Sequence, residues 1–208
     1  MRAGSGLVGG ALILLAALGG YLVGSLPTAD PLGRLWGVDL RGEGSRNPGA
    51  NNALRLGGPP LAALVLLVEV AKGVVAVLGG AALAGEVGAV LAGVFAAVGN
   101  VYNLWYRFAG GKGLAITGGV LLALWPTVLI PLLVLLAVVA LATRSSGMAA
   151  LTALCGLVAA GFLWAAYSLP TVWGIPPGGQ LIFAAVGLTT VLTPKHWRDA
   201  RFRTPDLD

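Results

Sequence analysis

Apolar residues in this chain gather into seven runs, separated by short polar or glycine-rich segments. The runs cover residues 6–25, 59–81, 84–102, 113–126, 127–143, 148–168 and 179–193. A helix of about 20 predominantly apolar residues is long enough to cross the hydrocarbon core of a bilayer. The pattern therefore predicts an all-α integral membrane protein, a bundle of about seven transmembrane helices. The division between the fourth and fifth runs rests on Trp125 and Pro126.

The composition supports a membrane protein without a separate soluble domain. Hydrophobic residues make up 57% of the 208 residues and charged residues only 10%, and the mean hydropathy is +0.89. Soluble domains carry about 25% charged residues. We therefore expect one polytopic membrane domain over residues 1–208. The first apolar run is longer than the core of about 7–15 residues that a signal peptide has, so it is predicted to be a retained helix.

Basic residues are distributed unevenly over the segments that connect the runs. If the loop 26–58 is cytoplasmic, eleven of the thirteen Lys and Arg residues fall on that side: Arg34, Arg41, Arg46, Arg55, Arg107, Lys112, Arg144, Lys195, Arg198, Arg201 and Arg203. The opposite side holds only Arg2, and Lys72 lies within a run. By the positive-inside rule, we expect the N-terminus outside and the C-terminus in the cytoplasm. This placement explains the net charge of +5, and no nucleic-acid partner is expected.

Two polar, glycine-rich loops lie on the expected cytoplasmic side. The first reads Gly44-Ser45-Arg46-Asn47-Pro48-Gly49-Ala50-Asn51-Asn52, with Arg55 just beyond, and the second runs from Gly99-Asn100 through Arg107 to Gly110-Gly111-Lys112-Gly113. Small residues let the backbone approach a ligand, while arginine and lysine supply fixed positive charge. The second loop also precedes an apolar helix, whose N-terminus favours an anion. Together the loops predict a shared site for a phosphate-like ligand, although each alone also fits an ordinary turn or hinge.

Other polar residues narrow the chemistry. The Gly-Gly-Lys-Gly segment has no Ser or Thr after its lysine and no preceding strand, so it is not a Walker A motif. Lys72 follows Glu69 by three residues, so it either pairs with that carboxylate or helps to line the anion site. The single histidine, His196, is predicted to be an interfacial residue rather than a catalytic base. No metal site and no cofactor are predicted.

Three motifs, in order along essentially the whole chain, carry a family resemblance. They are Gly44 to Asn52, preceded by Gly24-Ser25-Leu26-Pro27; then Glu69-Val70-Ala71-Lys72-Gly73; and Gly99-Asn100 through Gly110-Gly111-Lys112-Gly113-Leu114-Ala115. The chain resembles the bacterial acyl-phosphate:glycerol-3-phosphate acyltransferases. That resemblance implies transfer of a fatty acyl group from acyl phosphate to glycerol 3-phosphate, giving lysophosphatidic acid and phosphate. It also implies a multi-pass protein of the bacterial inner membrane, with no cofactor and an active site that faces the cytoplasm.

The resemblance assigns roles to twelve positions in these motifs. The expected catalytic residues are Ser45, Asn100, Arg107 and Lys112, and the expected phosphate-binding residues are Asn47, Gly49, Asn52, Arg55, Lys72, Gly110, Gly111 and Gly113. The implied partners are glycerol 3-phosphate, acyl phosphate and the lipid bilayer. Because an acyl phosphate is already an activated donor, positioning and charge stabilisation can supply the catalysis without a protein nucleophile.

This chain departs from the family's usual pattern inside the same motifs. The family usually has histidine where Asn100 stands, lysine where Arg107 stands, and often lysine where Ala109 stands. Asparagine cannot take up a proton as histidine can. Two alternatives therefore stand beside the acyltransferase: a divergent member with altered substrate or lost catalysis, and a membrane anion carrier. A carrier is expected to have repeated halves and polar residues at the midplane, whereas this chain has no internal repeat and its polar groups cluster at one surface.

Overall fold

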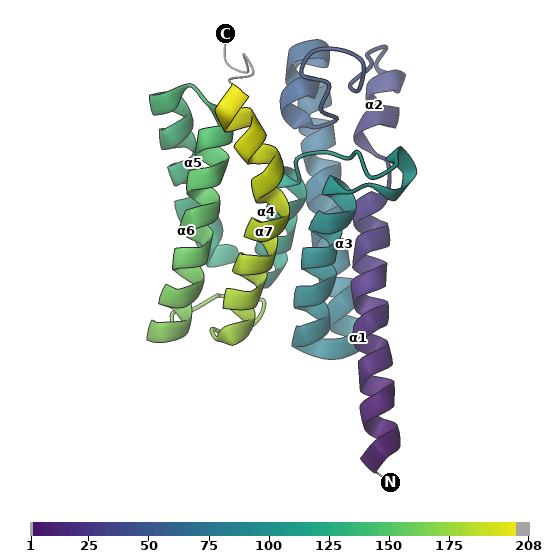
Figure 1. The fold of residues 1–208 in the computed structure, drawn as a ribbon, viewed down its shortest axis with the longest axis vertical. Coiled ribbons are helices and arrows are strands. Elements are labelled where there is room, and N and C mark those ends of the chain that lie inside the picture. The colour runs from purple at the N-terminus through teal and green to yellow at the C-terminus, as the bar shows by residue number, and fades with distance from the viewer. Residues whose placement is uncertain (1, 203–208) are drawn as a thin grey trace.

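The fold is a bundle of long helices joined by short connections (Figure 1). This computed structural model describes residues 2–202, with the side chains of residues 8–201. The elements are α1 (Arg2–Ser25), α2 (Ala29–Leu35), α3 (Ala50–Val101), η1 (Leu104–Tyr106), α4 (Leu114–Leu124), η2 (Pro126–Val128), α5 (Leu129–Thr143), α6 (Ser146–Tyr167) and α7 (Gly179–Phe202). There is no strand among the residues that the structure describes, so the predicted all-α class is confirmed.

The long element α3 is a tight helical hairpin rather than one continuous rod. Its backbone leaves the helical region at Gly58, whose φ is 74°, just before Pro59 and Pro60. It leaves that region again at Ala84 and at Gly85, whose φ is 59°, and the chain reverses at this second break. The predicted runs 59–81 and 84–102 are the two arms of this hairpin. The arms approach closely because Gly80 and Gly88 face each other: a Cβ on Gly80 would overlap the carbonyl oxygen of Gly88. Small residues at such contacts let helix backbones pack in lipid, where the hydrophobic effect between helices is absent.

This contact leads to a prediction about α3. A Gly80→Ala variant is expected to lower the free energy of unfolding by about 1–3 kcal/mol, because overpacking forces the two arms apart. Gly79→Ala is the matched control, since nothing lies within 4 Å of a Cβ built there. Thermal unfolding in detergent measures both variants. Equal stability of the two would contradict the close hairpin contact.

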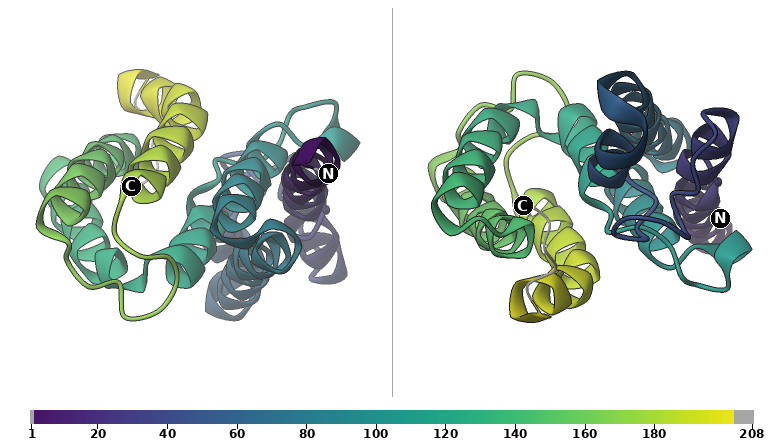
Figure 2. Two further views of the ribbon diagram at one scale, coloured as in Figure 1. Left: turned by 90° about the horizontal axis from the view of Figure 1, so that it is seen from below. Right: turned by 90° about the horizontal axis from the view of Figure 1, so that it is seen from above.

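The helices form two groups with α4 between them (Figure 2). In one group, α1 and α2 pack against α3; in the other, α5 and α7 pack against α6. Helix α4 packs against α3, where a Cβ on Gly119 would overlap the backbone of Val70. The main core lies where α3, α4 and α7 meet and is built around fully buried residues such as Trp125, Leu181 and Leu188. The space between the two groups is where the site described below opens.

The two polar loops and the C-terminal end of α7 lie at one end of the bundle, drawn uppermost in Figure 1. The turn at Ala84 and Gly85 lies at the other end. Helix α7 runs to Phe202, so the predicted end of this helix at residue 193 is wrong, and Lys195, Arg198 and Arg201 stand on a helix instead of in a tail. Arg203 and the side chain of Arg2 lie outside the described residues.

Helix length and composition identify fewer membrane spans than the seven apolar runs predict. Within the described residues, four helical stretches are long and apolar enough to cross a membrane: Val8–Leu35, Ala50–Tyr106, Pro126–Thr143 and Ser146–Tyr167. Leu114–Leu124 is apolar but shorter. The stretch Ala50–Tyr106 contains both arms of the α3 hairpin. The expected total of about seven crossings and the orientation of the termini stay predictions.

Candidate active site

A cavity of about 510 Å³ opens between the two helix groups and changes character along its length. Its polar part is lined by Ser45, Asn47, Asn100, Lys112 and His196. Its apolar part is lined mainly by leucines of α4, α5 and α6: Leu121, Leu122, Leu129, Leu132, Leu133, Leu136, Leu154 and Leu157. Small-molecule sites usually measure about 300–1,000 Å³ and combine an apolar lining with a few polar groups. The shape suits a molecule with an anionic head and a long apolar tail.

Three helix N-termini meet at the polar part of this cavity. They are Gly49 and Ala50 at the start of α3, Gly113 and Leu114 at the start of α4, and Ser146 at the start of α6. Backbone N–H groups at helix N-termini lack helical partners, and each macrodipole adds positive potential there. Among the described lining residues, Lys112 is the one Lys or Arg and Glu69 the one carboxylate. The polar part is therefore built to receive an anion.

The first loop is held in shape by Asn52, which is fully buried. The Asn52 amide nitrogen donates to the carbonyl oxygens of Leu40 at 3.0 Å and Glu43 at 3.1 Å, and its oxygen accepts from the Ser45 backbone N–H at 2.9 Å. Both donors of the amide are thus used. Asn52 thus holds the loop that presents Ser45 and Asn47 to the cavity, and its expected binding of phosphate stays a prediction.

The second loop closes on itself through the two glycines before Lys112. The Gly110 and Gly111 N–H groups donate to the carbonyl oxygens of Val101 at 3.1 Å and Asn100 at 3.0 Å. These two N–H groups donate within the chain, and the expected binding of phosphate at Gly110 and Gly111 stays a prediction. Glycine is required at 110 for a steric reason, since a Cβ there would overlap the carbonyl oxygen of Asn100. Gly113, with φ 81°, then begins α4.

Two cations outside the cavity lining join the loops to each other and to α7. The Arg41 guanidinium donates to the Ala109 carbonyl oxygen at 2.9 Å and stacks 4.0 Å from the centre of the Tyr106 ring. The Lys195 ammonium donates to the carbonyl oxygens of Gly110 and Gly111, the latter at 2.8 Å. From sequence both residues contributed only to the charge count, because nothing along the chain indicates which distant carbonyl a lysine will meet.

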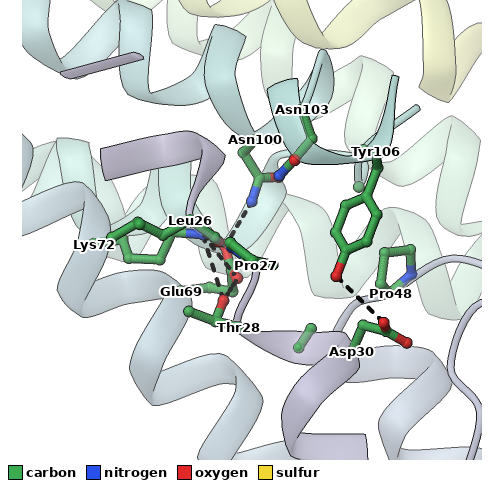
Figure 3. A pocket seen from close by; sticks show the side chains of 13 residues that line it. Leu26, Pro27, Thr28, Asp30, Pro48, Glu69, Lys72, Asn100, Asn103 and Tyr106 are labelled. Carbon is green, nitrogen blue, oxygen red and sulfur yellow. Dashed lines mark hydrogen bonds and ion pairs between the residues drawn. The ribbon is translucent and has the colours of Figure 1, made fainter. Parts of the chain in front are cut away.

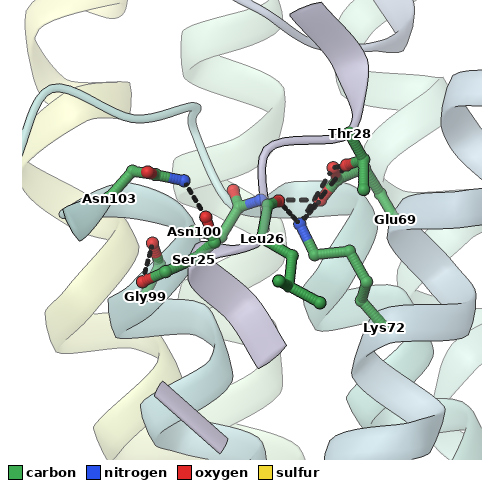
Figure 4. Close-up of polar contacts among 8 residues, drawn as sticks. All are labelled: Ser25, Leu26, Thr28, Glu69, Lys72, Gly99, Asn100 and Asn103. Carbon is green, nitrogen blue, oxygen red and sulfur yellow. Dashed lines mark hydrogen bonds and ion pairs between the residues drawn. The ribbon is translucent and has the colours of Figure 1, made fainter. Parts of the chain in front are cut away.

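A buried polar network lies beneath the cavity (Figures 3 and 4). The Glu69 carboxylate accepts from the Lys72 ammonium at 3.2 Å, from the Asn100 amide at 2.6 Å and from the Thr28 hydroxyl. Lys72 also donates to the Leu26 carbonyl oxygen at 2.9 Å. Lys72 lines a separate space of about 20 Å³ and not the large cavity. Of the two roles left open for Lys72, the structure shows the ion pair with Glu69, and its expected binding of phosphate stays a prediction.

The pairing of Lys72 predicts a stability effect. A Lys72→Met variant leaves Glu69 as an uncompensated buried charge, and we expect it to lower the free energy of unfolding by about 3–5 kcal/mol. The double variant Lys72→Met, Glu69→Leu is expected to recover much of this loss, because replacing both partners removes the stranded charge. Thermal unfolding in detergent compares the two. A double variant no more stable than the single one would argue against the pair.

The two arginines expected in the site, Arg107 and Arg55, do not line the cavity. Arg107 is exposed at the end of η1, in the left-handed backbone region with φ 50°. Arg107 is thus outside the cavity lining, and its expected catalytic role stays a prediction. Arg55 is exposed on the first turns of α3 and is likewise absent from the cavity lining. A role for Arg55 in phosphate binding stays a prediction.

Two cavity-lining residues escaped sequence reasoning. Ser146, at the start of α6, lines the polar part, and so does His196, which is buried and not interfacial as predicted. His196 lies beyond the apolar run 179–193. Burial and the nearby Lys112 ammonium lower its pKa to about 4. The ring is therefore neutral at pH 7 and offers one hydrogen-bond donor and one acceptor. The one sequence signal for a buried His196 was its position, one helical turn beyond the apolar run 179–193.

No group of three or more potential metal ligands occurs among the His, Cys, Asp and Glu residues that the structure describes. The polar part of the cavity instead combines helix N-termini, one ammonium group, hydroxyls, side-chain amides and the His196 ring, while the one carboxylate of the described lining, Glu69, already accepts from Thr28, Lys72 and Asn100. These groups donate hydrogen bonds, so they favour an oxyanion ligand over a cation.

Comparison with known proteins identifies the family. The sequence profile described as "Glycerol-3-phosphate acyltransferase" matches residues 14–202. A glycerol-3-phosphate acyltransferase of Synechococcus sp. (strain JA-3-3Ab) is 43% identical over 83% of this chain and 85% of that protein. One of Synechococcus sp. (strain JA-2-3B'a(2-13)) is 50% identical over 56% of this chain and 59% of its own length. The chain belongs to the glycerol-3-phosphate acyltransferase family, and the resemblance noted in its motifs is confirmed.

A solved structure supports the same assignment. The chain is similar to the crystal structure of PlsY (YgiH), an integral membrane glycerol 3-phosphate acyltransferase, in its glycerol 3-phosphate form. The TM-score is 0.77 at 26% identity, and the match covers 94% of each chain. The fold is thus that of an integral membrane enzyme of this family.

Proposed function

We propose that this protein transfers a fatty acyl group to a hydroxyl of glycerol 3-phosphate, with acyl phosphate as the donor. The hydroxyl oxygen attacks the acyl carbon, the bond from that carbon to the phosphate oxygen breaks, and the departing phosphate takes the hydroxyl proton. The products are lysophosphatidic acid and inorganic phosphate. The observation that carries the proposal is a single cavity that joins three helix N-termini and Lys112 to a leucine-lined groove. Family membership favours this enzyme over an anion carrier.

The polar part of the cavity accounts for the phosphate groups. Lys112 supplies charge, the starts of α3, α4 and α6 supply backbone donors, and Ser45 and Asn47 supply a hydroxyl and an amide. Charge-assisted hydrogen bonds of this kind are about twice as strong as neutral ones. Because both substrates and both products carry phosphate, one anion-binding region serves every step. Asn52 and Gly110 act indirectly, by holding the two loops that present these groups.

The leucine-lined part of the cavity accounts for the acyl chain. Helix α5, which contributes Leu129, Leu132, Leu133 and Leu136 to the lining, has no buried residue, and Leu133 is 60% exposed. The groove therefore has a thin outer wall that faces the surroundings of the bundle. In a bilayer those surroundings are acyl chains, so a lipid-like donor reaches the groove sideways without crossing water.

Catalysis in this cavity rests on positioning and charge stabilisation. The donor phosphate is a good leaving group, and donors already in place stabilise the oxyanion that forms at the acyl carbon. Asn100 cannot act as a base; its amide donates to Glu69 at 2.6 Å and so helps to keep that carboxylate in the buried network. The proposed reaction therefore needs no proton acceptor at position 100, where the family usually has histidine.

The membrane arrangement belongs to the same proposal. Seven crossings place the N-terminus outside and the C-terminus in the cytoplasm of a bacterial inner membrane, with the active site facing the cytoplasm. The N-terminal end of α1 and the C-terminal end of α7 lie at opposite ends of the bundle, which supports an odd number of crossings (Figure 1). The basic residues Arg41, Lys112 and Lys195 lie at the end that holds the cavity mouth, in agreement with the positive-inside rule.

A direct assay tests the function. The purified protein in lipid nanodiscs is supplied with palmitoyl phosphate and labelled glycerol 3-phosphate, and lysophosphatidic acid is measured by chromatography. We expect product from acyl phosphate and none when acyl-CoA or acyl carrier protein replaces it. Product from acyl-CoA alone would change the proposed donor. Absence of product with every donor would leave the divergent member with lost catalysis as the better description.

The groove leads to a prediction about chain-length preference. Gly118 lines the cavity on α4, and a Cβ there meets no atom within 4 Å. A Gly118→Phe variant is expected to lower kcat/KM for palmitoyl phosphate about tenfold and to affect octanoyl phosphate little, because the ring shortens the groove. The ratio of the two rates is measured for variant and parent. An equal loss with both donors would indicate that the acyl chain lies elsewhere.

A further inference from the structure

Helix α7 contacts the second loop through residues of one helical turn. The Asp199 carboxylate pairs with the Lys112 ammonium, and four residues earlier the Lys195 ammonium donates to the carbonyl oxygens of Gly110 and Gly111. Lys195 is thus occupied by the loop backbone, although it stands on the same face of α7 as Asp199. The carboxylate of Asp199 is directed at the side chain of Lys112.

This pair holds the Lys112 ammonium at the edge of the cavity. Lys112 lines the cavity but Asp199 does not, and the two side chains are only 22% and 15% exposed. The Asp199 backbone is fixed in turn by α6, since a Cβ on Gly147 would overlap the backbone nitrogen of Ala200. Asp199 therefore stays in place beside Lys112, whose flexible four-carbon side chain ends in a compact ammonium group. In the structure the ammonium points toward an anion that belongs to the protein.

A phosphate group in the polar part of the cavity needs the same ammonium. Within the described lining, no other Lys or Arg is present, and His196 is neutral at pH 7. Two anions, the Asp199 carboxylate and the ligand phosphate, thus compete for one cation. The carboxylate also adds like-charge repulsion close to the ligand, which is only partly screened at a site of this depth.

We propose that Asp199 is an internal competitor for the substrate phosphate. It holds Lys112 aside in the empty site, and it weakens the binding of every phosphate-bearing ligand by the cost of breaking the Lys112 pair. After the reaction it recaptures Lys112 and so speeds the release of inorganic phosphate. This inference rests on the proposed function, because it concerns the affinity of the same anion site. Asp199 acts through Lys112 and is a positioning residue, not a catalytic one.

The test measures phosphate binding without turnover. An Asp199→Asn variant keeps the shape and removes the charge, and calorimetric titration in detergent with inorganic phosphate is expected to give about tenfold tighter binding than the parent. Asp199→Glu keeps the charge and is expected to bind phosphate as weakly as the parent. Glu86→Gln is the matched control, because it removes the same charge from an exposed residue at the α3 turn, and its phosphate affinity should equal the parent's.

The possible outcomes separate this inference from the proposed function. Equal phosphate binding by Asp199→Asn overturns the inference about Asp199, because its carboxylate would then have no effect on phosphate affinity. Weaker binding also overturns it, because the carboxylate would then help Lys112 to bind phosphate. Asp199→Ser removes the same charge and serves as the test if Asp199→Asn does not fold. If the parent binds phosphate but forms no lysophosphatidic acid, the proposed function fails while the comparison of affinities still decides the role of Asp199. In the active enzyme, Asp199→Asn should lower KM for glycerol 3-phosphate about tenfold.

Discussion

A Lys112→Ala variant is expected to lose about a hundred- to a thousandfold in kcat/KM for glycerol 3-phosphate. Lys112 is the one Lys or Arg in the described lining of the cavity, and Asp199 holds its ammonium at the edge of that cavity. Removing one donor preorganised for a developing charge typically costs about 10²–10³ in rate. Formation of lysophosphatidic acid from palmitoyl phosphate measures the effect.

Two controls show whether the loss comes from Lys112 itself. Arg198→Ala removes a positive charge from an exposed position on α7 near the same end of the bundle, and it should keep nearly full activity. Lys112→Arg keeps the charge and should recover part of the activity, although a guanidinium cannot reproduce the compact geometry of an ammonium. A Lys112→Ala enzyme within a few-fold of the parent would mean that the helix N-termini alone hold the substrates.

A Gly110→Ala variant is expected to lower kcat/KM about a hundredfold or more. The added Cβ would overlap the Asn100 carbonyl oxygen, which is a backbone atom and cannot turn away. The loop must shift, so the bond from the Gly110 N–H to the Val101 carbonyl oxygen breaks and Lys112 is displaced. A misplacement of about 1 Å at a reacting centre can cost about 10²-fold.

The control for this variant is another glycine with open space around it. Gly79 lies on an exposed face of α3, and Gly79→Ala is expected to leave both activity and thermal unfolding unchanged. Gly110→Ala should lose far more activity than stability, because the strain is confined to one loop. Normal turnover by Gly110→Ala would show that the second loop tolerates a shift, and that glycine at position 110 is not required to hold the loop in its active shape.

Local patterns were sufficient to predict the long apolar helices, but not helix α2 or the start of α3 at Ala50, which lie in polar sequence before the run 59–81. Apolar runs report helices in a membrane protein because backbone polar groups must be satisfied within each segment there. An apolar run does not report where a helix ends outside the membrane, so the predicted end of α7 at residue 193 is wrong. Residues 194–202 are polar, and polar residues continue a helix once it leaves the apolar region and packs on neighbouring segments. Lys195, His196 and Asp199 consequently stand on a rigid element, and sequence reasoning had placed them in a tail.

The roles of individual motif residues were harder to predict. Asn52, Lys72 and Lys112 all occur in matching motifs, yet Asn52 is buried under a loop, Lys72 is paired with Glu69, and Lys112 reaches the cavity. A motif identifies which positions matter together but does not distinguish a residue that touches the ligand from one that shapes the loop. That distinction depends on which partners occupy its donors, and those partners are far away in sequence.

The sequence by itself determined that this is a helical membrane protein of the glycerol-3-phosphate acyltransferase family with two polar, glycine-rich loops, because periodicity, charge placement and motif spacing are local properties of the chain. Only the tertiary structure decided which residues form the site. It brought the starts of α3, α4 and α6 to one cavity, added Ser146 and His196 to the lining, left Arg107 outside that lining, and set Asp199 against Lys112. The physical reason is that burial and pairing arise from contacts between helices, and no single segment contains the information about which distant group will satisfy its charge.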